Sequence, residues 1–457
     1  MKTLFYNARL VDSEIDTNGA LLIDDDVIVS VYTGNFSTEQ KAKVLQKDIA
    51  DELAFIDCEG KTLMPSFIDM HVHFRYPGQT EKEDLESGLN AAVAGGFGTL
   101  VLMPNTKPVV SSSELAHSIE EEAESYGKAS IIQTVSITKN FSGTDTSHLD
   151  NLDRIPIVTE DGFDVPTANV MLEAMEKCAS SGIIVNCHCE DMTLTPLAKK
   201  CRNAALSLIE KYDETREDAK IVAAQIDAYL EEANMILSLS EDIATLRNIE
   251  IAYATNCPVH ISHVSTKNSI EAIRRAKQNG MNITCEITPH HFSLDCDKPN
   301  MLRYLVNPPI RTKKDRAALL KALTDGTCDV ISTDHAPHTL ADKVAGAPGF
   351  PGLETSFAVA HTELVQTGFL PLTKLSELMS AKPAQILGLD NFSANDLTPP
   401  RGKLRKHFLA NLVLVDLHET WIVDSTKFKT KGKVCPFEGK QLFGKVCSTY
   451  YMGKKVY

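Results

Sequence analysis

The chain has 457 residues, 43% hydrophobic and 23% charged, which is typical of a folded protein with one large α/β domain and a satellite, or two to three ordinary domains. Its 46 basic and 61 acidic residues give a net charge of −15. This excess of acidic residues argues against nucleic acid or an anionic membrane surface as a partner. An anionic substrate would have to be bound by a few specifically positioned basic side chains.

The N-terminal segment and the cysteines predict a cytoplasmic protein. Residues 1–19 alternate apolar and polar side chains and lack the apolar core of a secretory signal. The sequence has no apolar run of about 18 residues, so we expect no transmembrane helix. Eleven cysteines without CxxC spacing fit no complete set of intramolecular disulfides, which indicates reduced thiols.

Residues 1–60 predict short strands separated by turns, as in TLFYNARLVD and GALLIDDDVIVSVYTG. Strand-like patterns return after Pro399 in ANLVLVDL, ETWIVD and KVCSTYYMGKKVY. We therefore expect residues 1–60 and 390–457 to form one small β domain that is built from both ends of the chain.

Between residues 61 and 389, strand-like segments alternate with helical patterns such as EKEDLESGLNAAVAGG. Eight strands alternating with helices over this length predict a (β/α)8 TIM barrel with insertions. An open, doubly wound sheet is the alternative, which strand counting does not exclude. The expected strands are Leu63–Ile68, Thr99–Met103, Ser130–Ile137, Ile155–Thr159, Ile183–Cys187, Pro258–Ser262, Ile283–Ile287 and Asp329–Thr333.

Residues 192–256 are too many for one ordinary connection in such a barrel. Their pattern is helical and highly charged, which predicts an extra helical excursion on the outside of the barrel. A subunit contact and a solvated helix pair are the two interpretations.

The segment IDMHVHFRYP, residues 68–77, places two histidines and an arginine at alternating positions. In an extended strand, His71, His73 and Arg75 would share one face. Two imidazoles at this spacing suit one divalent metal ion, such as zinc. The guanidinium two places on suits a substrate carboxylate beside that metal.

Further metal-ligating residue types follow later strands at their carboxyl ends, where barrels build active sites. These candidates are Glu160 and Asp161 after strand four, His188 after strand five, His263 after strand six and Asp334 after strand eight. Their shared position predicts that they meet the strand-one histidines at one rim.

Four histidines and two carboxylates predict one metal ion, or two bridged by Asp161. The strand-one histidines would bind one ion, and His188 with His263 the other. Asp334 would take a proton from metal-bound water, whose hydroxide is the nucleophile, and return it to a leaving nitrogen. The arrangement predicts a metal-dependent hydrolase.

An ordered series of motifs supports this interpretation: DMHVHFRYPG, MPNTKP, TEDG, CHCED, HISHVST, VNPPIR and STDHAPH. The series resembles the amidohydrolase superfamily and, within it, class I dihydroorotases. The resemblance covers about Lys61 to Leu389 and, more weakly, Pro436 to Tyr457. That family interconverts N-carbamoyl-L-aspartate and L-dihydroorotate in de novo pyrimidine synthesis.

The resemblance implies roles for individual residues and for cofactors. It implies one or two zinc ions per subunit, and either a homodimer or an association with aspartate transcarbamoylase. Implied metal ligands are His71, His73, Asp161, His188, His263 and Asp334, and Asp334 is also the implied general acid/base on the metal side. Implied substrate residues are Arg75, Asn105 and His338 for the carboxylate and Asn307 for the pyrimidine ring. Tyr76, Gly98, Glu160 and Asn411 depart from the family pattern without removing an expected ligand.

Three other functions are alternatives. Hydantoinases and dihydropyrimidinases resemble a variant with a carboxylated lysine where this chain has Asp161, and allantoinase is disfavoured by the same missing lysine. A dihydroorotase-like subunit without activity would have lost ligands, but all six rim residues are present here.

Other histidines have open interpretations. His335 either orients Asp334 or caps a helix, and His260 is expected to face away from the site as a structural residue. His290 and His291 either line the pocket or pack behind it.

Overall fold

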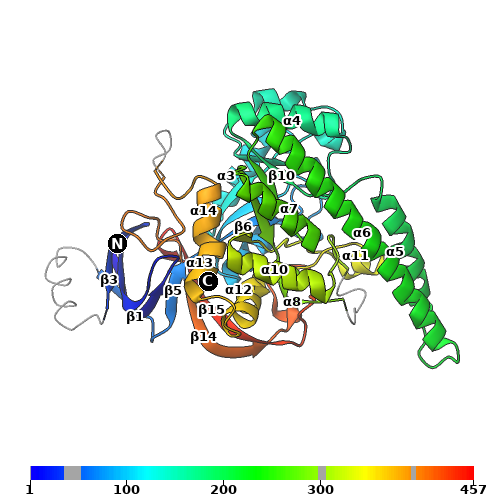
Figure 1. Ribbon diagram of the computed structural model, residues 1–457. Coiled ribbons are helices and arrows are strands. Elements are labelled where there is room, and N and C mark those ends of the chain that lie inside the picture. Colours follow the sequence, from blue (N-terminus) through cyan, green and yellow to red (C-terminus); the bar gives the residue numbers. More distant parts are fainter. Residues whose placement is uncertain (1, 35–52, 297–304, 393–397) are drawn as a thin grey trace.

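The computed structural model describes residues 2–34, 53–296, 305–392 and 398–457. Residues 35–52 of the expected N-terminal β unit therefore lie outside the described residues. Within the described ranges, a barrel forms the centre of the molecule, a β domain lies on one side, and a long helical hairpin projects from the other (Figure 1).

Two parallel sheets, joined by two single bridges, form the barrel. One sheet has the order β6-β7-β8, and the other has the order β13-β12-β11-β10-β9. Val135 pairs with Val158, and Val72 pairs with His335, so the ring closes. The predicted barrel is confirmed, and the open sheet is excluded. The strands are β6 (Phe67–Val72), β7 (Phe97–Leu102), β8 (Ser130–Gln133), β9 (Ile157–Thr159), β10 (Ile184–Cys187), β11 (Val259–Ile261), β12 (Ile283–Ile287) and β13 (Val330–Ile331).

Helices follow most barrel strands and cover the outside of the barrel (Figure 1). Their ends obey local rules: Thr266 caps α7 by accepting from Ser269 N, and Gly182 at φ +67° ends α4. The α-helices are α2 (Leu85–Ala94), α3 (Ser113–Glu124), α4 (Ala168–Ser181), α5 (Thr195–Ile209), α6 (Ala219–Thr255), α7 (Lys267–Gln278), α8 (Pro289–Ser293), α10 (Lys313–Asp325), α11 (Leu340–Val344), α12 (Leu353–Ala360), α13 (Leu372–Ser376) and α14 (Lys382–Ile386). Shorter 3₁₀ or π turns are η1 (Lys139–Phe141), η2 (Ser147–Asn151), η3 (His361–Val365), η4 (Glu377–Ala381) and η5 (Ser425–Lys427).

Apolar side chains close the amino end of the barrel and leave the carboxyl end for polar residues. Ile68, Val101 and Val330 pack with Ala384 of α14 in one cluster. Ser380, just before α14, donates to Ser66 O at 3.1 Å, where β6 begins. Burial of apolar side chains between the amino end of the barrel and α14 stabilises the barrel at the end opposite the polar residues.

The β domain combines both ends of the chain, as predicted. Its sheet has the order β16-β15-β14-β5-β1-β2-β3, with β4 paired to β1, and Leu63 of β5 faces Leu414 of β14. Its strands are β1 (Lys2–Val11), β2 (Asp16–Asp24), β3 (Val27–Thr33), β4 (Leu53–Asp57), β5 (Thr62–Pro65), β14 (Leu412–Ile422), β15 (Gln441–Tyr451) and β16 (Lys454–Lys455).

The expected first barrel strand, Leu63–Ile68, is split between the two domains. Its first half is β5 in the β domain, and the barrel begins at Phe67. The split occurs at Ser66, whose N–H donates to Asn411 O at 2.9 Å and so binds the chain to the neighbouring domain. The division into 1–60, 61–389 and 390–457 stays a prediction, and this pairing favours a slightly later start of the barrel.

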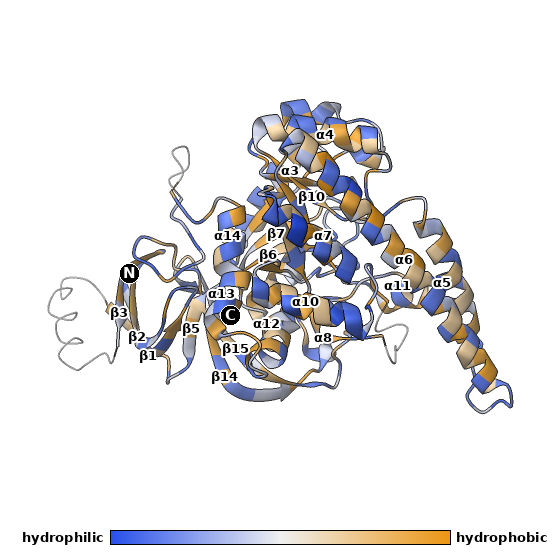
Figure 2. Cartoon of the chain, viewed as in Figure 1, coloured by the Kyte–Doolittle hydropathy of each residue, from blue (hydrophilic) through white to orange (hydrophobic). Residues whose placement is uncertain are grey.

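The expected excursion at residues 192–256 is confirmed as an antiparallel hairpin of α5 and α6. Its core is small and includes Ala198, Ala233 and Leu237. Met235 and Leu239, by contrast, are 67% and 52% exposed. Figure 2 shows hydrophobic and hydrophilic residues mixed along both helices. Across the described ranges, none of the helices is both long and apolar enough to span a bilayer.

Candidate metal centre and active site

Histidines from different strands converge on Asp161 at the carboxyl end of the barrel. The Oδ1 atom of Asp161 lies 3.1 Å from His71 Nε2, 3.0 Å from His188 Nδ1 and 3.7 Å from His263 Nε2. Its Oδ2 atom lies 3.4 Å from His73 Nε2. All five side chains are buried. They form two groups that share Asp161, and the ligand atoms of each group lie within 4.8 Å of one another.

These donors fit a divalent metal ion. Although His71 Nε2 lies close to Asp161, this buried nitrogen forms no hydrogen bond with any described residue. His188 Nδ1 and His263 Nε2 face each other at 3.0 Å beside the Asp161 carboxylate. Imidazole nitrogens around a shared carboxylate are a ligand set that suits zinc and its neighbours. The rim can therefore hold one metal ion in either group, or two ions with Asp161 between them.

Buried carboxylates give this rim a negative charge that a cation would compensate. Burial raises the pKa of Asp161, but the charges of His71 and His188 outweigh it and hold the pKa well below its usual value. Burial lowers the pKa of His71, but Asp161 and Glu286 raise it well above normal. A metal ion would take the place of these imidazole protons, because it binds the neutral ring.

Asp334 lies at the edge of the first group. Its Oδ1 atom is 3.2 Å from His73 Nε2 and 3.7 Å from His71 Nε2. Burial raises the pKa of Asp334, but the hydrogen bond with His73 brings it below the usual value. Asp334, Arg75 and His263 all have positive φ, at 48°, 55° and 28°. Such backbone strain costs about 1–3 kcal/mol per residue and clusters at active sites.

Glu286 is a site residue that the sequence analysis missed. It lies on β12, its Oε1 atom is 2.7 Å from His71 Nδ1, and it accepts from His263 N at 3.1 Å. His260, expected to face away, reaches the other carboxylate oxygen at 3.3 Å. A carboxylate behind a metal-ligating histidine fixes the ring tautomer and orientation. The sequence signal that could have revealed Glu286 is a charged residue inside the apolar strand ITCEI.

Asp69 is a second missed residue, and it ties the first strand to the last. Its Oδ1 atom accepts from His71 N at 3.1 Å and from Thr333 N at 3.1 Å. Burial raises the pKa of Asp69 to about 7. The bonds place the backbone of His71 next to the backbone that leads into Asp334.

Arg75 reaches the site by a turn and not by strand alternation, because β6 ends at Val72 and Arg75 has a positive φ. Its Nη2 donates to His338 Nε2 at 3.1 Å. Burial, together with the Arg75 charge, lowers the pKa of His338 to about 3, so this ring is neutral. Asn105 Oδ1 lies 2.9 Å from His73 Nδ1. Both residues are therefore tied to His73: Arg75 follows it by two positions in the sequence, and Asn105 contacts its ring.

Asn307 lies in the loop before α10 and contacts a different part of the chain from these residues. Its Oδ1 accepts from Arg202 Nη1, on α5. Pro308, the next residue, lines a small cavity together with His188 and Glu190. The predicted ring-contacting residue is therefore held by a side chain of the hairpin, which the sequence analysis did not foresee.

Contacts favour one interpretation for two of the other histidines. His335 Nδ1 accepts from Gly352 N at 3.1 Å and from Leu353 N at 3.4 Å, so it caps the start of α12. His291 Nε2 lies 3.0 Å from Pro308 O, which favours a packing role. His290 packs edge-on against a phenylalanine, and its two interpretations stay predictions.

Two departures from the family pattern also have local explanations. Glu160 accepts from Thr138 N at 2.8 Å, so of the two acids after β9 it is Asp161 that faces the histidines. At Gly98, a Cβ would lie 2.3 Å from Ser66 Oγ, so the space that a larger side chain needs is filled.

Comparisons with known proteins agree with this geometry. The family model described as "Amidohydrolase family" matches residues 62–456. The chain is 36% identical over 460 residues to a dihydroorotase from Clostridium botulinum, covering 100% of both chains. It is 35% identical over 455 residues to a dihydroorotase from Caldanaerobacter subterraneus, covering 95% of this chain and 96% of that relative.

Solved structures with the same fold include L-hydantoinase from Arthrobacter aurescens, with a TM-score of 0.82 and 24% identity over 99% of this chain and 95% of that one. Another is dihydropyrimidinase from Brevibacillus agri, with a TM-score of 0.77 and 20% identity over 100% and 95%. At this identity, the likeness establishes the fold alone. The family match and the full-length relatives decide the assignment: the chain belongs to the amidohydrolase family and, within it, to the dihydroorotases.

Proposed function

We propose that this chain is a metal-dependent dihydroorotase that interconverts N-carbamoyl-L-aspartate and L-dihydroorotate. The observation that carries the proposal is the Arg75–His338 pair beside the histidine–aspartate rim. A guanidinium next to a metal centre suits a small substrate that has a carboxylate close to its reacting amide. The full-length resemblance to dihydroorotases supports the same reaction.

The metal centre would contain zinc, as one ion or as a pair. Its ligands would be His71, His73, Asp161, His188, His263 and Asp334. When bound there, such an ion lowers the pKa of water and polarises the amide carbonyl. The protein's part is to orient the donors: Glu286 bonds His71 from behind at 2.7 Å, and Asn105 bonds His73 from behind at 2.9 Å.

Asp334 would carry the proton between the attacking water and the leaving nitrogen. Its Oδ1 lies 3.2 Å from His73 Nε2, at the edge of the first ligand group. A general base has to lie within hydrogen-bond reach of the proton that it takes. In ring closure, the same carboxyl would return the proton along the reverse path.

Arg75, Asn105 and His338 would bind the substrate carboxylate. Because a guanidinium only donates, His338 Nε2 accepts from Arg75, and the ring hydrogen of the neutral imidazole lies on Nδ1. Asn105 Oδ1 is taken by His73, which leaves the Asn105 amide hydrogens for an anion. Arg75 and Asn105 would thus offer N–H donors to one negatively charged substrate group, and His338 would contribute by holding the Arg75 guanidinium.

The alternatives have less support. Hydantoinase activity would draw only on the shared fold, and Asp161 stands where a carboxylated lysine would be expected. A subunit without activity is disfavoured because all six rim residues converge. We place the enzyme in the cytoplasm, since the eleven cysteines of the described residues form no disulfide. A homodimer or an association with aspartate transcarbamoylase is the expected assembly.

One assay tests the function. We expect purified, zinc-loaded protein to change the absorbance of L-dihydroorotate as the ring opens and to form it again from N-carbamoyl-L-aspartate. Chelation should remove the activity, and added zinc should restore it. Hydantoin and allantoin are the controls. Turnover of either control without turnover of dihydroorotate would contradict the proposal.

A further inference from the structure

The α5–α6 hairpin reaches the active-site rim through Arg202. The guanidinium of Arg202 donates through Nη1 to Asn307 Oδ1 and through Nη2 to Val306 O, at 3.1 Å for the second bond. One planar fork therefore binds two consecutive residues of the loop before α10. Lysine could not reproduce this geometry, because its ammonium is a point charge on a flexible stem.

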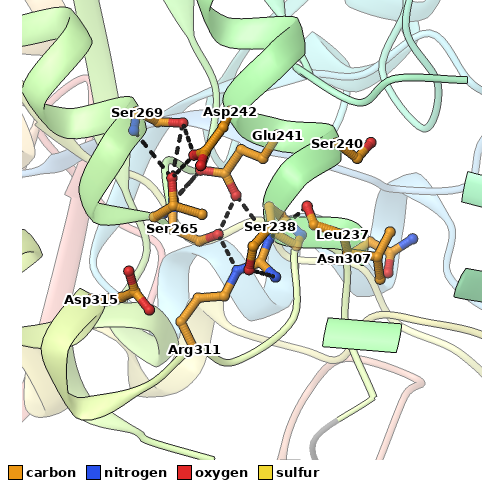
Figure 3. A network of polar contacts seen from close by, with 12 residues as sticks. Leu237, Ser238, Ser240, Glu241, Asp242, Ser265, Ser269, Asn307, Arg311 and Asp315 are labelled. Atoms are coloured by element: carbon orange, nitrogen blue, oxygen red, sulfur yellow. Dashed lines mark hydrogen bonds and ion pairs between the residues drawn. The ribbon is translucent and has the colours of Figure 1, made fainter. Parts of the chain in front are cut away.

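The base of the hairpin is fixed firmly enough to place Arg202. Glu241 of α6 accepts from Ser265 N at 2.9 Å, Thr266 N at 3.0 Å and Arg311 Nη2 at 3.0 Å. Arg311 also donates to Leu237 O at 3.1 Å. Figure 3 shows this network around Glu241 and Arg311. α6 is thus bound both to the loop after His263 and to the loop that contains Asn307.

The Arg202 contact determines which end of the Asn307 amide is available. An arginine side chain has five N–H donors and no acceptor. The atom of Asn307 that faces Arg202 must therefore be the oxygen, and the NH₂ group remains for another partner. An NH₂ group recognises a carbonyl oxygen and not a ring N–H.

Asn307 and Arg202 lie near the His188 side of the rim. Pro308, next to Asn307, lines a small cavity with His188 and Glu190. The Glu190 carboxylate interacts electrostatically with Arg202, and burial lowers the pKa of Arg202 to about 10. Arg202 therefore stays charged near neutral pH, and a half-buried charge with two oxygen partners favours one fixed arrangement of those partners.

We propose that Arg202 is a positioning residue for substrate specificity, which holds Asn307 so that its amide nitrogen donates to a carbonyl oxygen of the cyclic ureide. This inference rests on the proposed dihydroorotase function. It gives the helical hairpin a role in the reaction: the hairpin carries the side chain that orients a substrate contact.

The first test separates substrate binding from chemistry at Arg202. Arg202→Met should raise the KM for L-dihydroorotate about tenfold, the effect of one lost hydrogen bond, and change kcat less than about twofold. Arg202→Lys should recover only part of this loss. Lys199→Met, on an exposed position of the same helix, is the matched control and should behave as wild type. Equal thermal midpoints would show that the variants fold.

The second test asks whether Arg202 acts through Asn307. Asn307→Asp keeps an oxygen for Arg202 but removes the NH₂ group, so it should raise KM as much as Asn307→Ala. The double variant Arg202→Met with Asn307→Ala should be no worse than Asn307→Ala alone. Additive losses, or an Asn307→Asp variant with wild-type KM, would overturn the inference.

The outcomes also distinguish the two proposals. A wild-type protein that turns over dihydroorotate, together with an unaffected Arg202→Met variant, would overturn only the role of Arg202. A wild-type protein without turnover would overturn the proposed function itself.

Discussion

The metal rim and the α5–α6 hairpin are held in place in different ways. At the rim, side chains from different strands bond one another: His71 contacts Glu286, and His73 contacts Asn105. The hairpin has a small core, with Leu237 among its members, and much of its apolar surface is exposed. Its base is held by the polar network and by Ala244, Ile249 and Ala252 of α6, which pack in the main hydrophobic core. Geometry at the rim therefore depends on polar contacts between strands, whereas the hairpin is fixed at its base and exposed beyond it.

This difference separates the expected effects of substitutions. A change at the rim should alter chemistry or metal affinity with little effect on folding, because each polar group is supported by several strands. A change on the outer face of the hairpin should alter neither, unless it disturbs the base or Arg202.

The largest effect is expected at Asp334. Asp334→Ala removes the proposed proton carrier and should lower kcat for dihydroorotate by about 10³-fold or more, within the range seen for general acid–base groups and their neighbours. The thermal midpoint and zinc content should stay near wild type, because the five other rim residues remain. Asp153→Ala, at an exposed position, is the control. Wild-type turnover in Asp334→Ala would remove this residue from the mechanism.

A smaller effect is expected behind the metal, at Glu286. Glu286→Gln keeps the shape but removes the charge that faces His71 Nδ1, so zinc affinity should fall about 10- to 100-fold. Competition with a chelating dye would measure it. Glu271→Gln, on a half-exposed side chain of α7, should leave affinity unchanged. Unchanged affinity in Glu286→Gln would mean that His71 is oriented without this carboxylate.

Glu286 also marks the limit of sequence-based prediction here. The HxH motif and the later histidines could be assigned to one rim, because parallel strands bring their carboxyl ends together. Glu286 lies within its strand and not after it, so counting residues beyond strand ends missed it. Asp69 was missed although it directly follows the expected strand Leu63–Ile68, because the observed strand β6 runs from Phe67 to Val72. Both bond backbone or ring atoms of His71, and such contacts have no spacing signature.

The fold, like the site, was predictable from the sequence only in part. Strand–helix alternation predicted the barrel, and the β-rich ends predicted the composite domain. The split at Ser66 was not predictable, because one apolar run, Leu63–Ile68, serves two sheets and only the pairing with Asn411 separates them. The hairpin was predicted as helical, but the Arg202–Asn307 contact joins residues 105 positions apart.

Lys343 of α11 joins the loop that contains Leu305 to the loop that follows α11. It is fully buried, and its Nζ donates to Leu305 O at 2.7 Å, Ala347 O at 2.9 Å and Gly349 O at 2.7 Å. Lys343→Met would leave these carbonyls without their donor and should destabilise the fold by about 2 kcal/mol. Chemical denaturation would measure the loss. An equally stable variant would mean that the two loops do not need this clamp.

The same lysine predicts a pH dependence. Burial lowers the pKa of Lys343 to about 7, and the nearby Arg202 charge adds to the shift. An unfolded lysine titrates near 10.4. Between about pH 7 and 10, the unfolded state therefore binds more protons, and stability rises with pH. The stability difference between wild type and Lys343→Met should widen over this range, and a constant difference would show that the buried lysine keeps its proton.

The smallest effect is expected on the outer face of the hairpin. Leu239 is 52% exposed on α6, two residues before Glu241, which anchors the helix. Leu239→Ser removes apolar surface that already faces solvent, so stability should change by less than about 0.5 kcal/mol, and kinetics should not change. Leu237→Ser, at a buried position one half-turn away, should instead loosen the hairpin and raise KM through Arg202. A loss in Leu239→Ser equal to that in Leu237→Ser, together with a change in molecular mass in solution, would show that this face is covered by another subunit.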